Sequence, residues 1–274
     1  MFKIIIMALL IFIGMVGYDN ITDKAQPTTP VQQEQQKVSK HEKSAAMALF
    51  TSLLPPKEEW PSPVHKFYLA FNMDEVIDPI RQNPNWTALE AMSRDIPQAL
   101  IAIEDHGFYN HGAIAVEGIL RAALANINAG EVVQGGSTLT QQFVKNIFLS
   151  HEQSIERKIE EAVLSLMLED NYSKDEILEL YLNTTYFGAG STGIKQASRT
   201  YFGKAPSALT LAEAAVIASL PYAPTGLNPL ENPEGCKKRQ LLVLAAMHKY
   251  GMINQGQLAE AKAEKIRLTN GTVM

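Results

Sequence analysis

Residues 210–220, TLAEAAVIASL, form the stretch of sequence that decides the fold. Thr210 and Glu213 stand at the spacing of a capping box, in which each side chain accepts a hydrogen bond from a free amide of the first helical turn. The residues from 212 to 220 are apolar on nearly every side of a helix, which is typical of a buried helix. We therefore expect this helix to lie at the centre of the core.

Other helix signals lie N-terminal to this stretch. Ser150 with Gln153 and Ser173 with Glu176 repeat the capping-box spacing. The helix predicted after the first pair covers residues 155–168, and its apolar face is formed by Ile159, Val163, Leu166 and Met167. The helix predicted after the second pair has an apolar face formed by Ile177, Leu178, Leu180 and Tyr181.

The rest of the sequence also favours helices. A helix over residues 241–250 should end at Gly251, as with a left-handed cap. Only residues 66–77, which contain KFYLAF, predict a strand. A chain of 274 residues that is 46% hydrophobic can bury one core, whole or divided into two lobes. We therefore expect one compact, mainly α-helical domain.

The N-terminus predicts a membrane attachment followed by a linker. Residues 4–17 are apolar, but the run is shorter than the roughly 20 residues of a typical membrane span. A cleaved signal peptide therefore competes with an anchor, and the poor cleavage signature favours an anchor over residues 1–18. Lys3 favours an outer location for the remainder of the chain. Residues 19–44 are polar and Gln-rich, which predicts a disordered linker before a globular domain over residues 45–274.

Charge and cysteine content exclude several kinds of protein. The 24 basic and 29 acidic residues give a net charge of -5, so no overall field favours nucleic acid. The single cysteine, Cys236, excludes a disulfide framework and a multi-cysteine zinc site. An anionic substrate would have to be held by local basic groups.

The segment IAIEDHGFYNHG, residues 101–112, contains the first candidate catalytic residue. An apolar helix runs directly into Glu104, and partial desolvation makes a carboxylate a better base near neutral pH. Glu104 is therefore a candidate general base, although a helix-end acid paired with Lys or Arg explains this segment equally well. Asp105, His106 and His111 could suggest a metal site, but three such residues in one turn-rich segment, without a second cluster, more often stabilise the local backbone.

The segment GGSTLTQQFVKN, residues 135–146, predicts a site for a phosphate-bearing ligand. The two glycines allow close backbone approach, Ser137 or Thr138 can cap the following helix, and a helix N-terminus presents free amides to an anion. Gln141 lies four residues after Ser137, and Lys145 lies four residues after Gln141, so we expect all three on one helical face. The alternative is a glycine turn before an ordinary amphipathic helix.

Three further charged residues are weaker candidates for the site. Glu161 lies four residues after Arg157, which by itself indicates a surface ion pair. Displacement of a sugar diphosphate, however, requires a base and, separately, neutralisation of the charge on the leaving group. The Arg157–Glu161 pair could contribute to that neutralisation. Arg239 precedes an apolar helix and is expected to tie helices together.

Five motifs together resemble those of family 51 glycosyltransferases, the peptidoglycan polymerases of class A penicillin-binding proteins and monofunctional transglycosylases. The motif residues, in chain order, are Glu104, Asp105, Phe108 and His111; Gly135, Ser137, Thr138, Thr140, Gln141, Gln142, Lys145 and Asn146; Arg157, Lys158 and Glu161; Lys174, Ile177, Leu178, Tyr181, Leu182 and Asn183; and Arg239, Val243 and Leu244. The resemblance covers roughly residues 96–266. Ala113 and Gln153 depart from it, at positions where many relatives have a glycine and a basic residue.

The resemblance implies a reaction and roles for these residues. Glu104 would deprotonate the 4-hydroxyl of lipid II, which attacks the anomeric carbon of the growing strand with inversion and release of undecaprenyl diphosphate. Glu161 and a divalent Mg or Mn ion would act at the diphosphate. The residues that would hold sugar and diphosphate are Ser137, Gln141, Gln142, Lys145 and Arg157. Structural or supporting roles fall to Asp105, Phe108, His111, Lys158, Asn183 and Arg239.

The resemblance also implies a setting for the enzyme. The expected fold is lysozyme-like, with a larger head lobe and a smaller, membrane-proximal jaw lobe. The expected location is the outer side of the bacterial cytoplasmic membrane, and the expected partners are lipid II, the glycan strand and other cell-wall synthesis proteins. Two alternatives of other classes are a lysozyme-like lytic enzyme, which shares the fold, and an inactive membrane-tethered scaffold. The cationic residues favour the polymerase, because cleavage of an uncharged glycosidic bond needs no diphosphate site.

Overall fold

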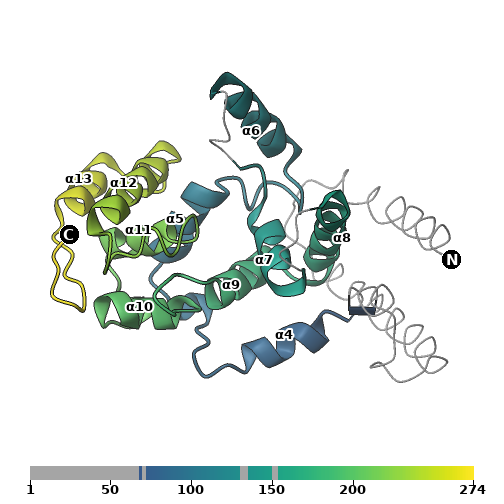
Figure 1. The fold of residues 1–274 in the computed structure, drawn as a ribbon, viewed down its shortest axis with the longest axis horizontal. Helices are drawn as coiled ribbons and strands as arrows, with labels where there is room; N and C mark the ends of the chain where they lie inside the picture. The colour runs from purple at the N-terminus through teal and green to yellow at the C-terminus, as the bar shows by residue number, and fades with distance from the viewer. Residues whose placement is uncertain (1–67, 70–71, 130–134, 150–153) are drawn as a thin grey trace. The chain divides into compact units, whose positions relative to one another are not determined.

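The computed structural model describes residues 68–69, 72–129, 135–149 and 154–274, and these residues are mainly helical (Figure 1). Apart from two isolated antiparallel bridges, Tyr186–Thr192 and Arg267–Val273, they contain no β-structure. The α-helices are α4 (Asp74–Arg81), α5 (Asp95–Glu104), α6 (Val116–Ala129), α7 (Leu139–Phe148), α8 (Ile155–Asn171), α9 (Lys174–Thr184), α10 (Ile194–Phe202), α11 (Leu211–Ser219), α12 (Pro233–Lys249) and α13 (Gln255–Ala263). Two short 3₁₀ turns, Leu89–Ala91 and Pro206–Ala208, also lie in the described part of the chain. The predicted mainly α fold is confirmed, whereas the predicted lobes stay a prediction.

The helix α11 is the centre of the core, as the sequence predicts. Every residue from Ala212 to Ser219 is buried, and α11 packs against both α5 and α12 (Figure 1). The small side chains of this helix, four of them alanines, allow neighbouring helices to approach closely. Burial of apolar surface contributes roughly 25 cal/mol per Å², so this contact is a main source of stability.

A second packing group surrounds α7, which contacts both α8 and α9 (Figure 1). Its inward residues Leu139, Phe143 and Val144 are at most 1% exposed. Leu139 lies within the polar GGSTLTQQ segment, and Phe143 and Val144 follow it directly. These buried side chains therefore anchor the start of α7.

Several predicted helix ends are confirmed. Ser173 with Glu176 and Thr210 with Glu213 both form complete capping boxes. Helix α12 ends in a Schellman motif, in which Gly251 adopts a φ of 73° and the Met252 amide donates to the Met247 carbonyl.

Three predictions about secondary structure are wrong. The strand expected over residues 66–77 is absent from the described residues of that range, because Tyr68 and Leu69 are helical and α4 begins at Asp74. Met73 and Ile77, which are both buried, lie four residues apart as on a helix. The cap of α8 is Ser154 rather than Ser150. Helix α12 begins at Pro233, earlier than predicted, with Asn232 as its cap.

The apolar face predicted for α8 is correct at Met167 but wrong at Ile159. Ile159 is 52% exposed, whereas Glu161 and Ser165 are buried together with Met167 and Leu168. A hydrophobic pattern alone would not bury Glu161, whose burial depends on paired cations described below. The inner face of α8 is therefore partly polar.

The predicted anchor and the predicted linker lie outside the described residues. Within the described part of the chain, none of the helices has the length and apolar character needed to cross a bilayer. The residues of the candidate site all lie in one compact unit, Ile80–Met274.

Candidate active site

Glu104 is the last residue of α5 and is half-buried. The helix before it is anchored by Leu100, Ile101 and Ala102, which are all buried. Nε2 of Gln142, on α7, donates a hydrogen bond of 3.0 Å to Oε2 of Glu104. Oε1 of Glu104 accepts no hydrogen bond from a described residue. One carboxylate oxygen is thus fixed by Gln142, and the other keeps its capacity to accept a hydrogen bond.

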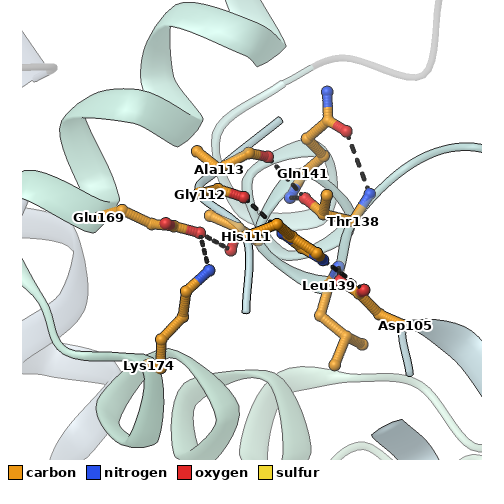
Figure 2. A network of polar contacts seen from close by, with 10 residues as sticks. Asp105, His111, Gly112, Ala113, Thr138, Leu139, Gln141, Glu169 and Lys174 are labelled. Atoms are coloured by element: carbon orange, nitrogen blue, oxygen red, sulfur yellow. Dashed lines mark hydrogen bonds and ion pairs between the residues drawn. The ribbon is translucent and has the colours of Figure 1, made fainter. Parts of the chain in front are cut away.

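Asp105 connects the end of α5 to the start of α7 (Figure 2). Its Oδ2 accepts a 3.0 Å hydrogen bond from the amide of Leu139, the first residue of α7. Its Oδ1 lies 2.6 Å from Nε2 of His111. A carboxylate at a helix N-terminus is also favoured by the helix dipole. Asp105 therefore fixes the position of α7 relative to Glu104.

His111 lies between two hydrogen-bond acceptors (Figure 2). Its Nε2 faces Asp105 and its Nδ1 lies 2.6 Å from the carbonyl oxygen of Gly112. Burial lowers the pKa of His111, but the hydrogen bond and charge of Asp105 and the Gly112 carbonyl raise it by more, so the net pKa lies above its ordinary value. The geometry therefore favours an imidazolium that donates from both nitrogens.

The start of α7 is held by its own cap. The Thr138 hydroxyl accepts from the Gln141 amide and donates to the Ala113 carbonyl at 2.8 Å, and Oε1 of Gln141 accepts from the Thr138 amide (Figure 2). Gln141 is 3% exposed and Lys145 is exposed, while Ser137 precedes the cap. The predicted single ligand-facing stripe of Ser137, Gln141 and Lys145 is therefore wrong, because capping turns the Gln141 side chain inward.

A second polar group contacts the first turn of α7. Oε1 of Glu169 accepts from the Thr140 hydroxyl at 2.5 Å and from the Lys174 ammonium at 2.6 Å. The same ammonium lies 4.6 Å from the centre of the Phe108 ring, which is fully buried. These contacts join α7, α8 and α9 to the loop after α5.

Glu161 lies between two cations although its side chain is only 2% exposed. Nη1 of Arg157 lies 3.3 Å from Oε2, and the Lys158 ammonium contacts Oε1 and also donates to the Ser137 hydroxyl at 3.0 Å. A buried carboxylate is stable only when it is paired in this way. The pair expected from the Arg157–Glu161 spacing is confirmed, but it is buried and includes a second cation.

The predicted metal does not fit Glu161 in this arrangement, because both carboxylate oxygens already contact cations. Within the described residues, no group of three His, Cys, Asp or Glu side chains could hold a metal ion. The divalent ion, which the resemblance associates with the substrate diphosphate, stays a prediction.

The other predicted residues have varied surroundings. The Lys145 ammonium makes no ion pair with a described residue. Asn183 accepts from the Thr87 amide at 2.8 Å and donates to the Thr87 carbonyl at 2.9 Å, which supports its structural assignment. The Arg239 guanidinium lies 4.0 Å from the centre of the Tyr222 ring.

Two elements that bear motifs, the end of α5 and the first turns of α8, converge on the start of α7. Glu104 contacts Gln142, Asp105 contacts Leu139, and Lys158 connects Glu161 to Ser137. The structure thus brings both predicted catalytic carboxylates to one short segment. Such an arrangement can combine a base with a cationic group.

Sequence reasoning missed one residue of this site. Tyr181 was named in an apolar face and in a motif but was given no role in the site, whereas its hydroxyl donates to Oε1 of Gln142 at 3.0 Å. The available signal was the hydroxyl itself, because a buried tyrosine usually has a hydrogen-bond partner.

Comparisons with known proteins agree with the motifs. The family model described as transglycosylase matches residues 73–248. The protein named "Putative transglycosylase H16_A0665" of Cupriavidus necator is 41% identical over 194 residues, which are 71% of this chain and 84% of that protein. Penicillin-binding protein 2D of Bacillus subtilis is 45% identical over 181 residues, which are 66% of this chain and 26% of that protein. Penicillin-binding protein 1A of Neisseria flavescens is 44% identical, and the match covers 68% of this chain and 23% of that protein.

The match therefore spans most of one relative but about a quarter of the two penicillin-binding proteins. The family match covers more than half of the chain and includes all five motifs. With its helical fold and converging carboxylates, the chain belongs to the transglycosylase family, the family 51 peptidoglycan glycosyltransferases.

Proposed function

We propose that this enzyme polymerises lipid II into β-1,4-linked glycan strands with inversion at the anomeric carbon. One observation carries the proposal: Glu104 and the Arg157–Lys158–Glu161 group both contact residues at the start of α7. The reaction needs a base at the attacking sugar and positive charge at the departing diphosphate. The start of α7 contacts a candidate for each: Glu104 for the base, and the Arg157–Lys158–Glu161 group for the positive charge.

Glu104 is the proposed general base. Its Oε2 is held by Gln142, and its Oε1 is available to take the proton of the incoming 4-hydroxyl. As the proton moves to Glu104, the sugar oxygen bonds to the anomeric carbon of the growing strand. The bond from that carbon to undecaprenyl diphosphate breaks at the same time, and the electron pair leaves with the diphosphate.

The cations near Glu161 are proposed to neutralise the leaving group. Nε of Arg157 is buried and has no hydrogen-bond partner among the described residues. A phosphate oxygen would satisfy this donor, and arginine is well suited to bind phosphate. Lys145, which is exposed and makes no ion pair with a described residue, would add a further positive charge. Glu161 would hold Arg157 and Lys158 in place rather than contact the sugar.

A membrane location is part of the proposal. On α6, Val116, Leu120 and Ile127 are 64%, 60% and 75% exposed, and Ile155 at the start of α8 is 78% exposed. Exposed apolar patches often mark sites of contact with another protein or with a membrane. They support catalysis at the outer surface of the cytoplasmic membrane, where lipid II and other cell-wall synthesis proteins would be available.

The test is a polymerisation assay with purified full-length chain and labelled lipid II in detergent. We expect labelled glycan products to lengthen with time while undecaprenyl diphosphate is released. A parallel incubation with preformed glycan strands distinguishes the lytic alternative. Shortening of those strands, without consumption of lipid II, would overturn the proposal; inertness in both assays would favour the scaffold alternative.

A further inference from the structure

Tyr181 is a core residue of α9 that is only 1% exposed, yet its hydroxyl reaches the candidate site. The hydroxyl donates to Oε1 of Gln142 at 3.0 Å, and Nε2 of Gln142 donates to Oε2 of Glu104 at 3.0 Å. Residues from α9, α7 and α5 thus form one chain of hydrogen bonds that ends at the proposed base.

The direction of this chain follows from the chemistry of its two ends. An ionised Glu104 can only accept hydrogen bonds, so the NH₂ group of Gln142 must face it. Oε1 of Gln142 then faces Tyr181, whose hydroxyl must donate. Burial and then the negative charge of Glu104 raise the pKa of Tyr181, so the hydroxyl keeps its proton at neutral pH. Only one orientation of the amide satisfies all three groups.

We propose that Tyr181 is a positioning residue for Glu104, which acts by orienting the Gln142 amide. The amide then fixes Oε2 of Glu104 and leaves Oε1 for the incoming hydroxyl. The inference rests on the proposed function, and it moves Gln142 from the set of residues that hold sugar and phosphate to the set that orients the base.

Loss of this orientation should slow the chemical step. A general base must lie within hydrogen-bond reach of the proton that it removes, and small displacements from the productive geometry slow a reaction strongly. Substrate affinity should change little, because Tyr181 is buried and cannot itself contact the substrate.

The experiment compares two tyrosine variants in the full-length chain. Tyr181→Phe keeps the buried ring and removes only the hydroxyl that donates to Gln142. We expect kcat to fall roughly tenfold with KM unchanged, which matches the loss of one hydrogen bond next to a charged group. Tyr201→Phe is the matched control, because Tyr201 is 0% exposed and its hydroxyl donates to the Phe187 carbonyl at 2.7 Å. It should lose similar stability and keep its kcat.

A pH profile provides a second test that a purely structural role would not affect. Gln142→Glu places a second carboxylate beside Glu104, and repulsion between two carboxylates disfavours the state in which both are ionised. The acid limb of kcat should therefore move to higher pH. If Tyr181→Phe does not fold, this profile decides the question, and an unchanged limb counts against the proposal.

The outcomes separate this proposal from the proposed function. If wild-type enzyme polymerises lipid II, Glu104→Gln does not, and Tyr181→Phe matches wild type, the positioning role is wrong and the function stands. If wild-type enzyme does not lengthen glycan at all, the proposed function is wrong, and the role of Tyr181 falls with it.

Discussion

Nε2 of His111 lies 2.6 Å from Oδ1 of Asp105, and the other oxygen of Asp105 accepts a hydrogen bond from the amide of Leu139 at the start of α7. One carboxylate thus joins a histidine to the helix that holds the candidate site. Because Asp105 directly follows Glu104, changes at His111 should affect both stability and the position of the base.

The stability of the enzyme should depend on the charge of His111. Its pKa is raised in the folded state, so the contribution is fully present below the unfolded pKa of about 6.5 and is lost as pH rises through the folded pKa. Asp105 favours the charged form, whereas burial and the charge of Lys174 oppose it. We expect His111→Gln to cost about 1.5 kcal/mol of unfolding free energy at pH 5.5 and less at pH 8.5.

The measurement is urea unfolding of wild type and His111→Gln across this pH range. His248→Gln is the control, because His248 is exposed at the end of α12. A stability difference for His111→Gln that stays constant with pH would show that the histidine is neutral in the folded protein.

Replacement of Glu104 should remove the reaction without removing the fold. Glu104→Gln keeps the shape of the side chain and an oxygen for the Gln142 amide, but it cannot accept a proton. General base catalysis typically contributes about a hundredfold to ten-thousandfold, so we expect a loss of kcat in that range. Lipid II polymerisation measures the loss, thermal unfolding checks the fold, and exposed Glu90→Gln is the control. Wild-type turnover in the Glu104 variant would exclude this residue as the base.

Glu161 should contribute far more to stability than an exposed acid of the same charge. Its side chain is 2% exposed and compensates Arg157 and Lys158, so Glu161→Gln leaves two cations without their partner. We expect a cost of about 3 kcal/mol, which is typical of breaking a buried ion pair. Arg81→Gln is the comparison, because the Arg81–Glu176 pair is 32% and 47% exposed and should contribute at most about 1 kcal/mol. Equal costs for the two variants, measured by urea unfolding, would contradict the importance of burial.

Lys145 should contribute to the binding of the substrate diphosphate. The residue is exposed, so Lys145→Met should leave the fold intact. A lost hydrogen bond between charged groups predicts that KM for lipid II rises about tenfold. Lys238→Met is the control, because Lys238 is also exposed but lies on α12. An unchanged KM in Lys145→Met, or an equal rise in both variants, would remove Lys145 from the diphosphate site.

The prediction of α8 shows why periodicity did not find the whole site. Its apolar residues suggested that Ile159 faces the core, but Ile159 is exposed and Glu161 is buried. A hydropathy pattern assigns a carboxylate to the surface, because burial of an unpaired charge is costly. The pairing that makes burial possible involves Arg157 and Lys158 together, and the sequence does not show which way they turn.

The strand predicted around KFYLAF failed for a related reason. A short apolar segment fits a strand or a buried helix equally well by periodicity. Asp74 and Glu75 at the first turn of α4, together with Met73 and Ile77 on one side, favour the helix.

By itself the sequence determined the central helix α11, the caps at Ser173 and Thr210, the mainly α fold and the family, because these depend on neighbouring residues along the chain. Only the tertiary structure decided the partners of Gln142, since Glu104 and Tyr181 lie 38 and 39 residues away from it. It also decided that Gln141 turns inward to close a cap. Hydrogen bonds between distant helices depend on how those helices pack, and local sequence patterns do not specify such packing.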